Sequence, residues 1–149
     1  MHGVLQTLGY VSIVLALACP IKALADDRKL ADSETLEGTW RADVADSQSI
    51  VLSIKGSAIE MSAVTGEKRV PIWTGKLSIS KDEPNQHMDW IELKAGNTKV
   101  PDNKCLFRLR GDVLLVIGGG PNQRPTRFYS GPGAEPKTLL FIRMDREKE

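Results

Sequence analysis

The stretch Ile50-Val51-Leu52-Ser53-Ile54-Lys55-Gly56-Ser57-Ala58-Ile59-Glu60-Met61-Ser62-Ala63 decides the fold class. Apolar residues recur at every second position on both sides of Gly56-Ser57, and a period of two is that of a half-buried β-strand. A glycine and a serine between two such runs favour a tight turn. The stretch therefore predicts a β-hairpin.

The same alternation continues outward from this hairpin in short units separated by Gly, Pro, Asn or Asp. We expect strands in the segment after Gly38 and over residues 50–55, 59–63, 72–80, 88–94, 104–110, 113–117 and 138–144, and residues 126–130 also look extended. No long segment has helical periodicity. About eight short strands with tight turns indicate a sandwich or a barrel.

A Gly-x-Trp pair, Gly38 and Trp40, opens the β region, and Arg143 lies near its end. In lipocalin-type barrels a Gly-x-Trp stands on the first strand, and an arginine from the last strand packs across the indole. Such a contact gains cation–π energy while the guanidinium still reaches backbone carbonyls. This resemblance favours an all-β fold, a single antiparallel up-and-down β-barrel of lipocalin-like type.

Further segments resemble an uncharacterised family of exported, lipocalin-like (calycin-type) domains found as paralogues in planctomycete-type bacteria. The segments that carry the resemblance are Leu36-Glu37-Gly38-Thr39-Trp40, residues 84–89 from Pro84 to Asp89, Gly111-Asp112-Val113-Leu114, Arg124-Pro125-Thr126-Arg127-Phe128, and residues 139–143. The resemblance as a whole covers roughly residues 33–146. The middle segment has one residue more than the family pattern. The resemblance implies a barrel and an exported protein and leaves the activity open.

Residues 1–25 have the layout of a secretory signal peptide. They contain no Asp or Glu, they carry an apolar stretch from Leu8 to Cys19, and they end in Ala23-Leu24-Ala25 before an acidic pair. The apolar stretch is shorter than the ~20 residues that span a bilayer. We therefore expect export to the periplasm or the medium, with cleavage before Asp26.

A second processing route competes, because Ala16-Leu17-Ala18-Cys19 resembles the lipobox of bacterial lipoproteins. In that case Cys19 would be acylated and would tether the protein to a membrane surface. Without lipidation we expect no membrane association.

The remaining chain is short enough for one domain, with a flexible arm over residues 26–35 and a barrel over residues 36–146. Without residues 1–25 the positive and negative charges balance. Balanced charge argues against nucleic-acid binding, which needs a basic surface. We expect a monomer that binds no cofactor.

Little in the sequence points to catalysis. After residue 25, His87 is the single histidine and Cys105 the single cysteine, so a multi-histidine zinc site cannot form. His87 falls in a predicted turn. Cys105 falls on an inward-facing stripe, where burial would raise the pKa of its thiol and make it inert. Gly118-Gly119-Gly120-Pro121 lacks the residues of a phosphate-binding loop. We expect no enzyme activity and no metal.

The aromatic residues leave two hypotheses for function. Trp73 and Phe107 could line an interior that holds a small apolar or amphiphilic molecule. Alternatively, the barrel is solid, and rim loops around residues 84–89 and 118–127 bind another envelope protein. Trp90 alternates out of phase with Ile91 and Leu93, which would place it on the outer face, where it would favour a protein partner. An empty interior supports the first hypothesis, and a filled core beside an exposed apolar patch supports the second.

Overall fold

The computed structural model describes residues 36–80 and 86–144. Nine strands follow one another in them: β1 (Gly38–Ala45), β2 (Gln48–Lys55), β3 (Ala58–Thr65), β4 (Lys68–Ser80), β5 (Gln86–Ala95), β6 (Thr98–Lys99), β7 (Asn103–Arg110), β8 (Val113–Gly118) and β9 (Leu139–Arg143). The predicted signal peptide, the arm and Cys19 lie outside the described residues. Within the described ranges, no helix has the length and apolarity needed to cross a membrane.

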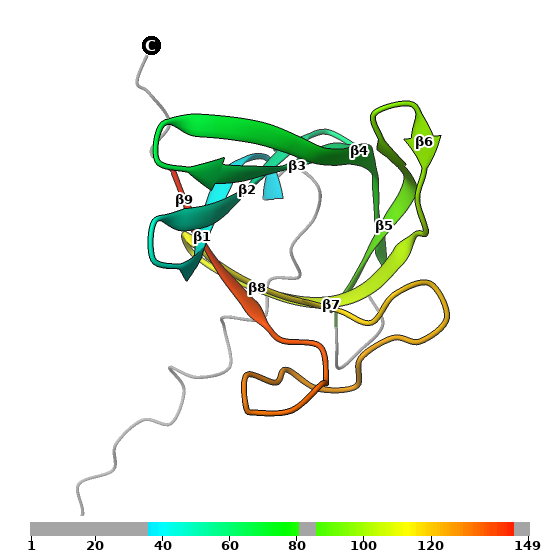
Figure 1. The fold of residues 1–149 in the computed structure, drawn as a ribbon. Helices are drawn as coiled ribbons and strands as arrows, with labels where there is room; N and C mark the ends of the chain where they lie inside the picture. The colour runs from blue at the N-terminus through cyan, green and yellow to red at the C-terminus, as the bar shows by residue number, and fades with distance from the viewer. Residues whose placement is uncertain (1–35, 81–85, 145–149) are drawn as a thin grey trace, which may run out of the picture.

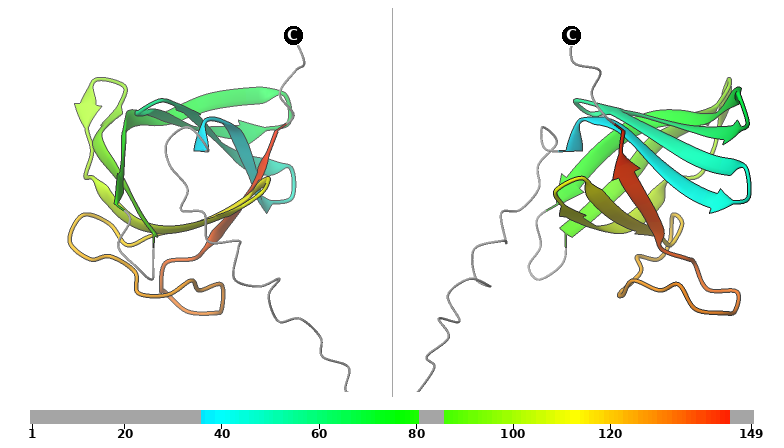
Figure 2. Two further views of the ribbon diagram at one scale, coloured as in Figure 1. Left: turned by 180° about the vertical axis from the view of Figure 1, so that it is seen from behind. Right: turned by 90° about the vertical axis from the view of Figure 1, so that its left-hand side faces the viewer.

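The strands close into a barrel (Figure 1). Each long strand pairs antiparallel with the next along the chain, and β9 returns to pair with β1. The short β6 pairs only with the end of β5. The predicted single up-and-down barrel of about eight strands is therefore confirmed, with β6 as a small addition. The views in Figure 2 show that the long segment between β8 and β9 lies outside the barrel wall.

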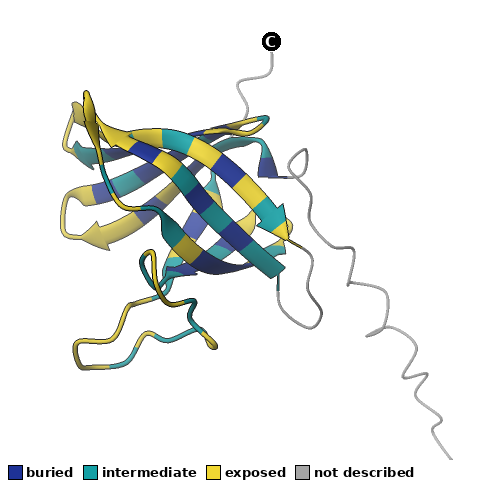
Figure 3. Cartoon of the chain, turned by 90° about the vertical axis from the view of Figure 1, so that its right-hand side faces the viewer, coloured by how far each residue is buried: buried dark blue, intermediate teal, exposed yellow. Residues whose placement is uncertain are grey.

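Buried and more exposed residues alternate along most strands (Figure 3), which is the pattern of strands with one face toward a core. The expected hairpin is present as β2 and β3, which pair in register over their whole length. Two local predictions are wrong. Residues 126–130 form no strand, and His87 belongs to β5, where it pairs with Ser80 and Leu106, instead of lying in a turn.

The prediction that Trp90 lies on the outer face is also wrong, because Trp90 is 5 % exposed and belongs to the core. A β-bulge explains the error. Where β4 advances by two residues, its partner β5 advances by three. Glu92 lies in this extra part of β5 and has a positive φ of 54°. The extra residue shifts the alternation, so that Trp90 and Leu93 both point inward. Asp102 accepts a hydrogen bond from the Glu92 N–H at 2.9 Å.

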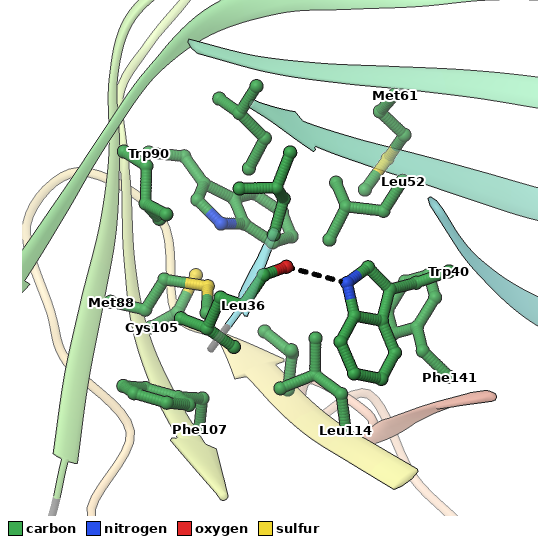
Figure 4. Close-up of a cluster of buried hydrophobic side chains, with 14 of the residues drawn as sticks. Leu36, Trp40, Leu52, Met61, Met88, Trp90, Cys105, Phe107, Leu114 and Phe141 are labelled. Carbon is green, nitrogen blue, oxygen red and sulfur yellow. Dashed lines mark hydrogen bonds between the residues drawn. The ribbon is translucent and has the colours of Figure 1, made fainter. Parts of the chain in front are cut away.

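The core is one contiguous cluster of sixteen buried residues from all eight long strands and Leu36. Trp40 and Phe141 are the largest of its fully buried side chains. Figure 4 shows the Trp40 Nε1–H donating a hydrogen bond to the Leu36 carbonyl oxygen at 2.9 Å. An eight-stranded barrel has an interior just wide enough for side chains to fill it. The part of the interior around Trp40 is filled in this way.

Arg143 joins the last strand to the first. Its guanidinium lies 4.0 Å from the centre of the Trp40 ring, the contact expected from the sequence, and donates a hydrogen bond to the Glu37 carbonyl at 2.6 Å. Gly38 makes room for it: a Cβ there would lie 3.0 Å from Arg143 Nη1, and the φ of +131° suits only glycine. The Gly-x-Trp and the distant arginine thus form one closure between β1 and β9.

Candidate functional site

The two predicted ligand contacts have different environments. Phe107 is 3 % exposed and packs inside the core cluster. Trp73 is half-buried on β4 and packs against that cluster, with its ring 5.1 Å from the Trp90 ring at an angle of 44°. Phe107 is therefore a packing residue, and Trp73 is the accessible member of the predicted pair.

Trp90 has an unusual feature beside Trp73. Its Nε1–H is buried and has no hydrogen-bond partner, the single such side-chain atom in the part of the chain that the structure describes. A buried donor without an acceptor costs about 1–3 kcal/mol. The indole N–H is thus available to an acceptor that enters beside Trp73.

Cys105 and His87 do not form a nucleophile–base pair. Met88 is the cross-strand partner of Cys105, and Leu106 is the partner of His87. Adjacent positions along a strand point to opposite faces, so His87 faces outward while Cys105 faces the core. Within residues 36–80 and 86–144, no three His, Cys, Asp or Glu side chains gather as metal ligands would.

Cys105 should be chemically inert in the folded protein. Burial, and secondarily the negative charge of Asp89, raises the pKa of its thiol from 9.0 to about 12. We expect no reaction with Ellman's reagent at pH 8 until denaturant is added. The unfolded thiol ionises at lower pH than the folded one, so stability should fall as pH rises above about 9. Fast labelling of the native protein would contradict this environment.

A cleft of about 670 Å³ lies across β1–β4. Its volume lies within the ~300–1,000 Å³ typical of small-molecule sites. Its lining follows the cross-strand register: Glu37, Gly38, Thr39, Ser53, Ile54, Lys55, Ala58, Ile59, Glu60, Thr74 and Gly75. Ile54 and Ile59 turn their side chains into the core. The accessible groups are therefore mainly hydroxyls and charged side chains around small apolar residues.

The charged groups of the cleft differ in how they are held. Glu37 accepts a hydrogen bond from the Gly56 N–H at 2.7 Å, and Glu60 accepts one from Ser62 at 3.1 Å and pairs with Arg69 at 3.3 Å. Lys55 has no acidic partner within ion-pair distance among the described residues. Both carboxylates thus serve local structure, while the Lys55 ammonium is available to a ligand.

Residues 119–138, which we call the β8–β9 loop, pack on the outer face of the barrel. Leu106 and Ile117 are cross-strand partners on that face, yet they are only 2 % and 3 % exposed. Arg124 fixes the loop through two bonds to Asp89, at 2.6 and 2.9 Å, and one to the Cys105 carbonyl at 2.8 Å. A smaller pocket of about 290 Å³ lies between the loop and Ile117.

The cleft was not predicted from the sequence as a site. Residues 118–127, which overlap the β8–β9 loop, were predicted as a rim loop that could bind an envelope protein, but the contact between Arg124 and Asp89 was not predicted. The cleft depends on which residues of four strands stand side by side, and one sequence does not give that register. The Arg124–Asp89 pair joins residues 35 positions apart. The signal that could have found it was present, because Asp89 and Arg124 each belong to a segment that carries the family resemblance.

The fold and the cleft define a closed, eight-stranded antiparallel β-barrel with a ligand-sized depression in its wall. No family model, no curated protein and no solved structure matches this chain.

Proposed function

We propose that this chain is a non-enzymatic binding barrel of the cell envelope that holds a small amphiphilic molecule in the cleft across β1–β4. The observation that carries the proposal is the ligand-sized volume of that cleft. The apolar part of the ligand would lie over Gly38, Ala58 and Gly75, and its polar head would face the hydroxyls and Lys55. Binding without turnover fits this set of groups, because both carboxylates hold structural contacts.

Ala58 offers a direct test. It is exposed at the start of β3 and lines the cleft, so Ala58→Phe should fill the cleft without disturbing the core. We expect it to weaken binding of a fluorescent fatty acid, cis-parinaric acid, by about tenfold or more, which corresponds to about 1.4 kcal/mol. Ala95→Phe is the matched control, because Ala95 is exposed at the end of another hairpin strand and does not line the cleft. Equal affinity of both variants would refute the site.

Lys55 gives the second half of the test. Lys55→Gln should lower the affinity for the fatty acid and reduce its dependence on salt, because an exposed charge acts through a screened field. Unchanged affinity and salt dependence would show that the ammonium takes no part.

A second candidate site is the barrel interior beside Trp73, which the unpartnered Trp90 Nε1–H favours. A ligand there would lose affinity in Trp73→Leu and keep it in Ala58→Phe. The two variants therefore distinguish the interior from the cleft.

Export, monomeric state and membership of the lipocalin-like exported family belong to the same proposal. The sequence of residues 1–25 and the quoted segments support them. An intact mass that begins at residue 26 would indicate release, and an acylated Cys19 would indicate a membrane tether. A mass that retains residues 1–25 would contradict both routes.

A further inference from the structure

A second surface of the barrel is suited to a macromolecular partner. Four apolar side chains face outward from β8 and β9, and we call them the β8–β9 face: Val113, Leu115, Leu140 and Ile142. They form two cross-strand pairs, Val113 with Ile142 and Leu115 with Leu140. Val113, Leu140 and Ile142 are 36 %, 52 % and 47 % exposed. A contiguous apolar group of this kind on a folded domain marks an interaction site.

The β8–β9 face lies beside a part of the barrel wall that the β8–β9 loop already covers. Leu106 on β7 and Ile117, farther along β8, also lie on the outside, and the β8–β9 loop buries Ile117 at one wall of its pocket. Phe128 of that loop lies against Arg108, with the guanidinium 5.4 Å from the ring centre. The loop thus covers one half of an outward apolar stripe, and the other half has no cover in the described part of the chain.

The charged residues around the β8–β9 face indicate which kind of partner it would bind. Arg108 and Arg110 on β7 are the cross-strand partners of Leu115 and Val113, and Arg41 on β1 is the partner of Ile142. Arg41 pairs with Asp43 at 3.0 Å, whereas Arg110 has no acidic partner among the described residues. Asp112, which directly precedes Val113, accepts a hydrogen bond from Arg143 Nε at 3.0 Å. The border on β7 is therefore basic.

We propose that the β8–β9 face docks an amphipathic segment of another protein, with apolar residues against Leu140 and Ile142 and acidic residues against Arg108 and Arg110. The barrel has no free strand edge in this region, because β8 and β9 are paired on both sides. The segment must therefore bind through its side chains instead of adding a strand. The cleft across β1–β4 is not involved, so the two sites can be tested separately.

The test uses the full chain labelled with ¹⁵N and two synthetic amphipathic helical peptides, which carry leucines on one face and either glutamates or lysines on its borders. We expect the glutamate peptide to shift amide signals of residues 113–117 and 139–144 and to bind about tenfold more tightly than the lysine peptide. Arg110→Glu should reverse this preference. Leu140→Ser should abolish binding, while Val70→Ser, a matched change at another exposed aliphatic residue, should not.

Four results would overturn the proposal. Equal affinity of the two peptides would remove the charge argument, and shifts outside the β8–β9 face would remove the site. If Leu140→Ser instead converts a dimer to a monomer in sedimentation, or abolishes binding to vesicles that contain phosphatidylglycerol, the occupant is a second copy or a lipid surface. Either outcome would replace the protein partner.

Discussion

We expect the replacement of Arg143 with alanine to lower the free energy of unfolding by about 3 kcal/mol, the sum of a cation–π contact and charge-assisted hydrogen bonds. The effect is large because of where Arg143 lies. The β1–β9 seam has only two registered pairs, Trp40 with Arg143 and Arg41 with Ile142. The Arg143 guanidinium covers Trp40 and binds the Glu37 carbonyl across this seam. Denaturant unfolding followed by tryptophan fluorescence measures the loss.

Two further variants test whether the contacts of the Arg143 guanidinium, and not ordinary packing, cause the loss of stability. Arg143→Lys keeps the charge but loses the planar stack, so it should recover only part of the stability. Arg41→Ala is the matched control on the same seam, because Arg41 is half-exposed and pairs only with the exposed Asp43. It should change stability by less than about 1 kcal/mol. If Arg143→Ala lowers the free energy of unfolding no more than Arg41→Ala does, the Arg143 contacts do not stabilise the closure between β1 and β9.

Replacing Arg124 with alanine should release the β8–β9 loop and cost about 2–4 kcal/mol. Arg124 and Asp89 are each about three-quarters buried, at 24 % and 28 % exposure, so removing one leaves the other charge without its bidentate partner. Leu106 and Ile117 would then become accessible. Limited trypsin digestion at Lys137, together with amide exchange at Leu106 and Ile117, measures the release.

Arg127→Ala is the control within the same loop. Arg127 is 69 % exposed, and its pair with Glu135 is long at 3.5 Å, so its loss should leave the loop in place. Asp89→Ala should reproduce the release seen for Arg124→Ala, and the double variant should add little to either single change. Independent, additive losses would show that the two residues do not act as a pair.

The sequence was sufficient for most of the strands, because they depend on local period, and the resemblance of Gly38, Trp40 and Arg143 to lipocalin-type barrels was sufficient to expect the closure. The hairpin of β2 and β3 follows from the alternation of Ile50 to Ala63, and the Arg143 contact follows from Gly38 and Trp40. Trp90 was misplaced because a bulge at Glu92 shifts the period by one residue. Alternation predicts faces only where each strand keeps its register.

The sites were harder to predict, because they depend on contacts between distant segments. The cleft assembles from four strands, and its residues are ordinary in sequence: two threonines, one serine, two glycines and one alanine beside two isoleucines and three charged residues. Residues 126–130 look extended, yet they form part of a loop that packs outside the barrel through Arg124. Phe107 has the inward phase expected of a ligand contact, but the same phase is expected of a core residue, and the core contains it.

Native mass spectrometry of the protein recovered gently from its source cells shows whether this barrel carries a small molecule. We predict a non-covalent adduct of small-molecule mass that leaves on denaturation and is absent from Ala58→Phe but present in Ala95→Phe. A clean mass of the protein alone, repeated under gentle extraction, would contradict the claim and would leave the β8–β9 face as the functional surface.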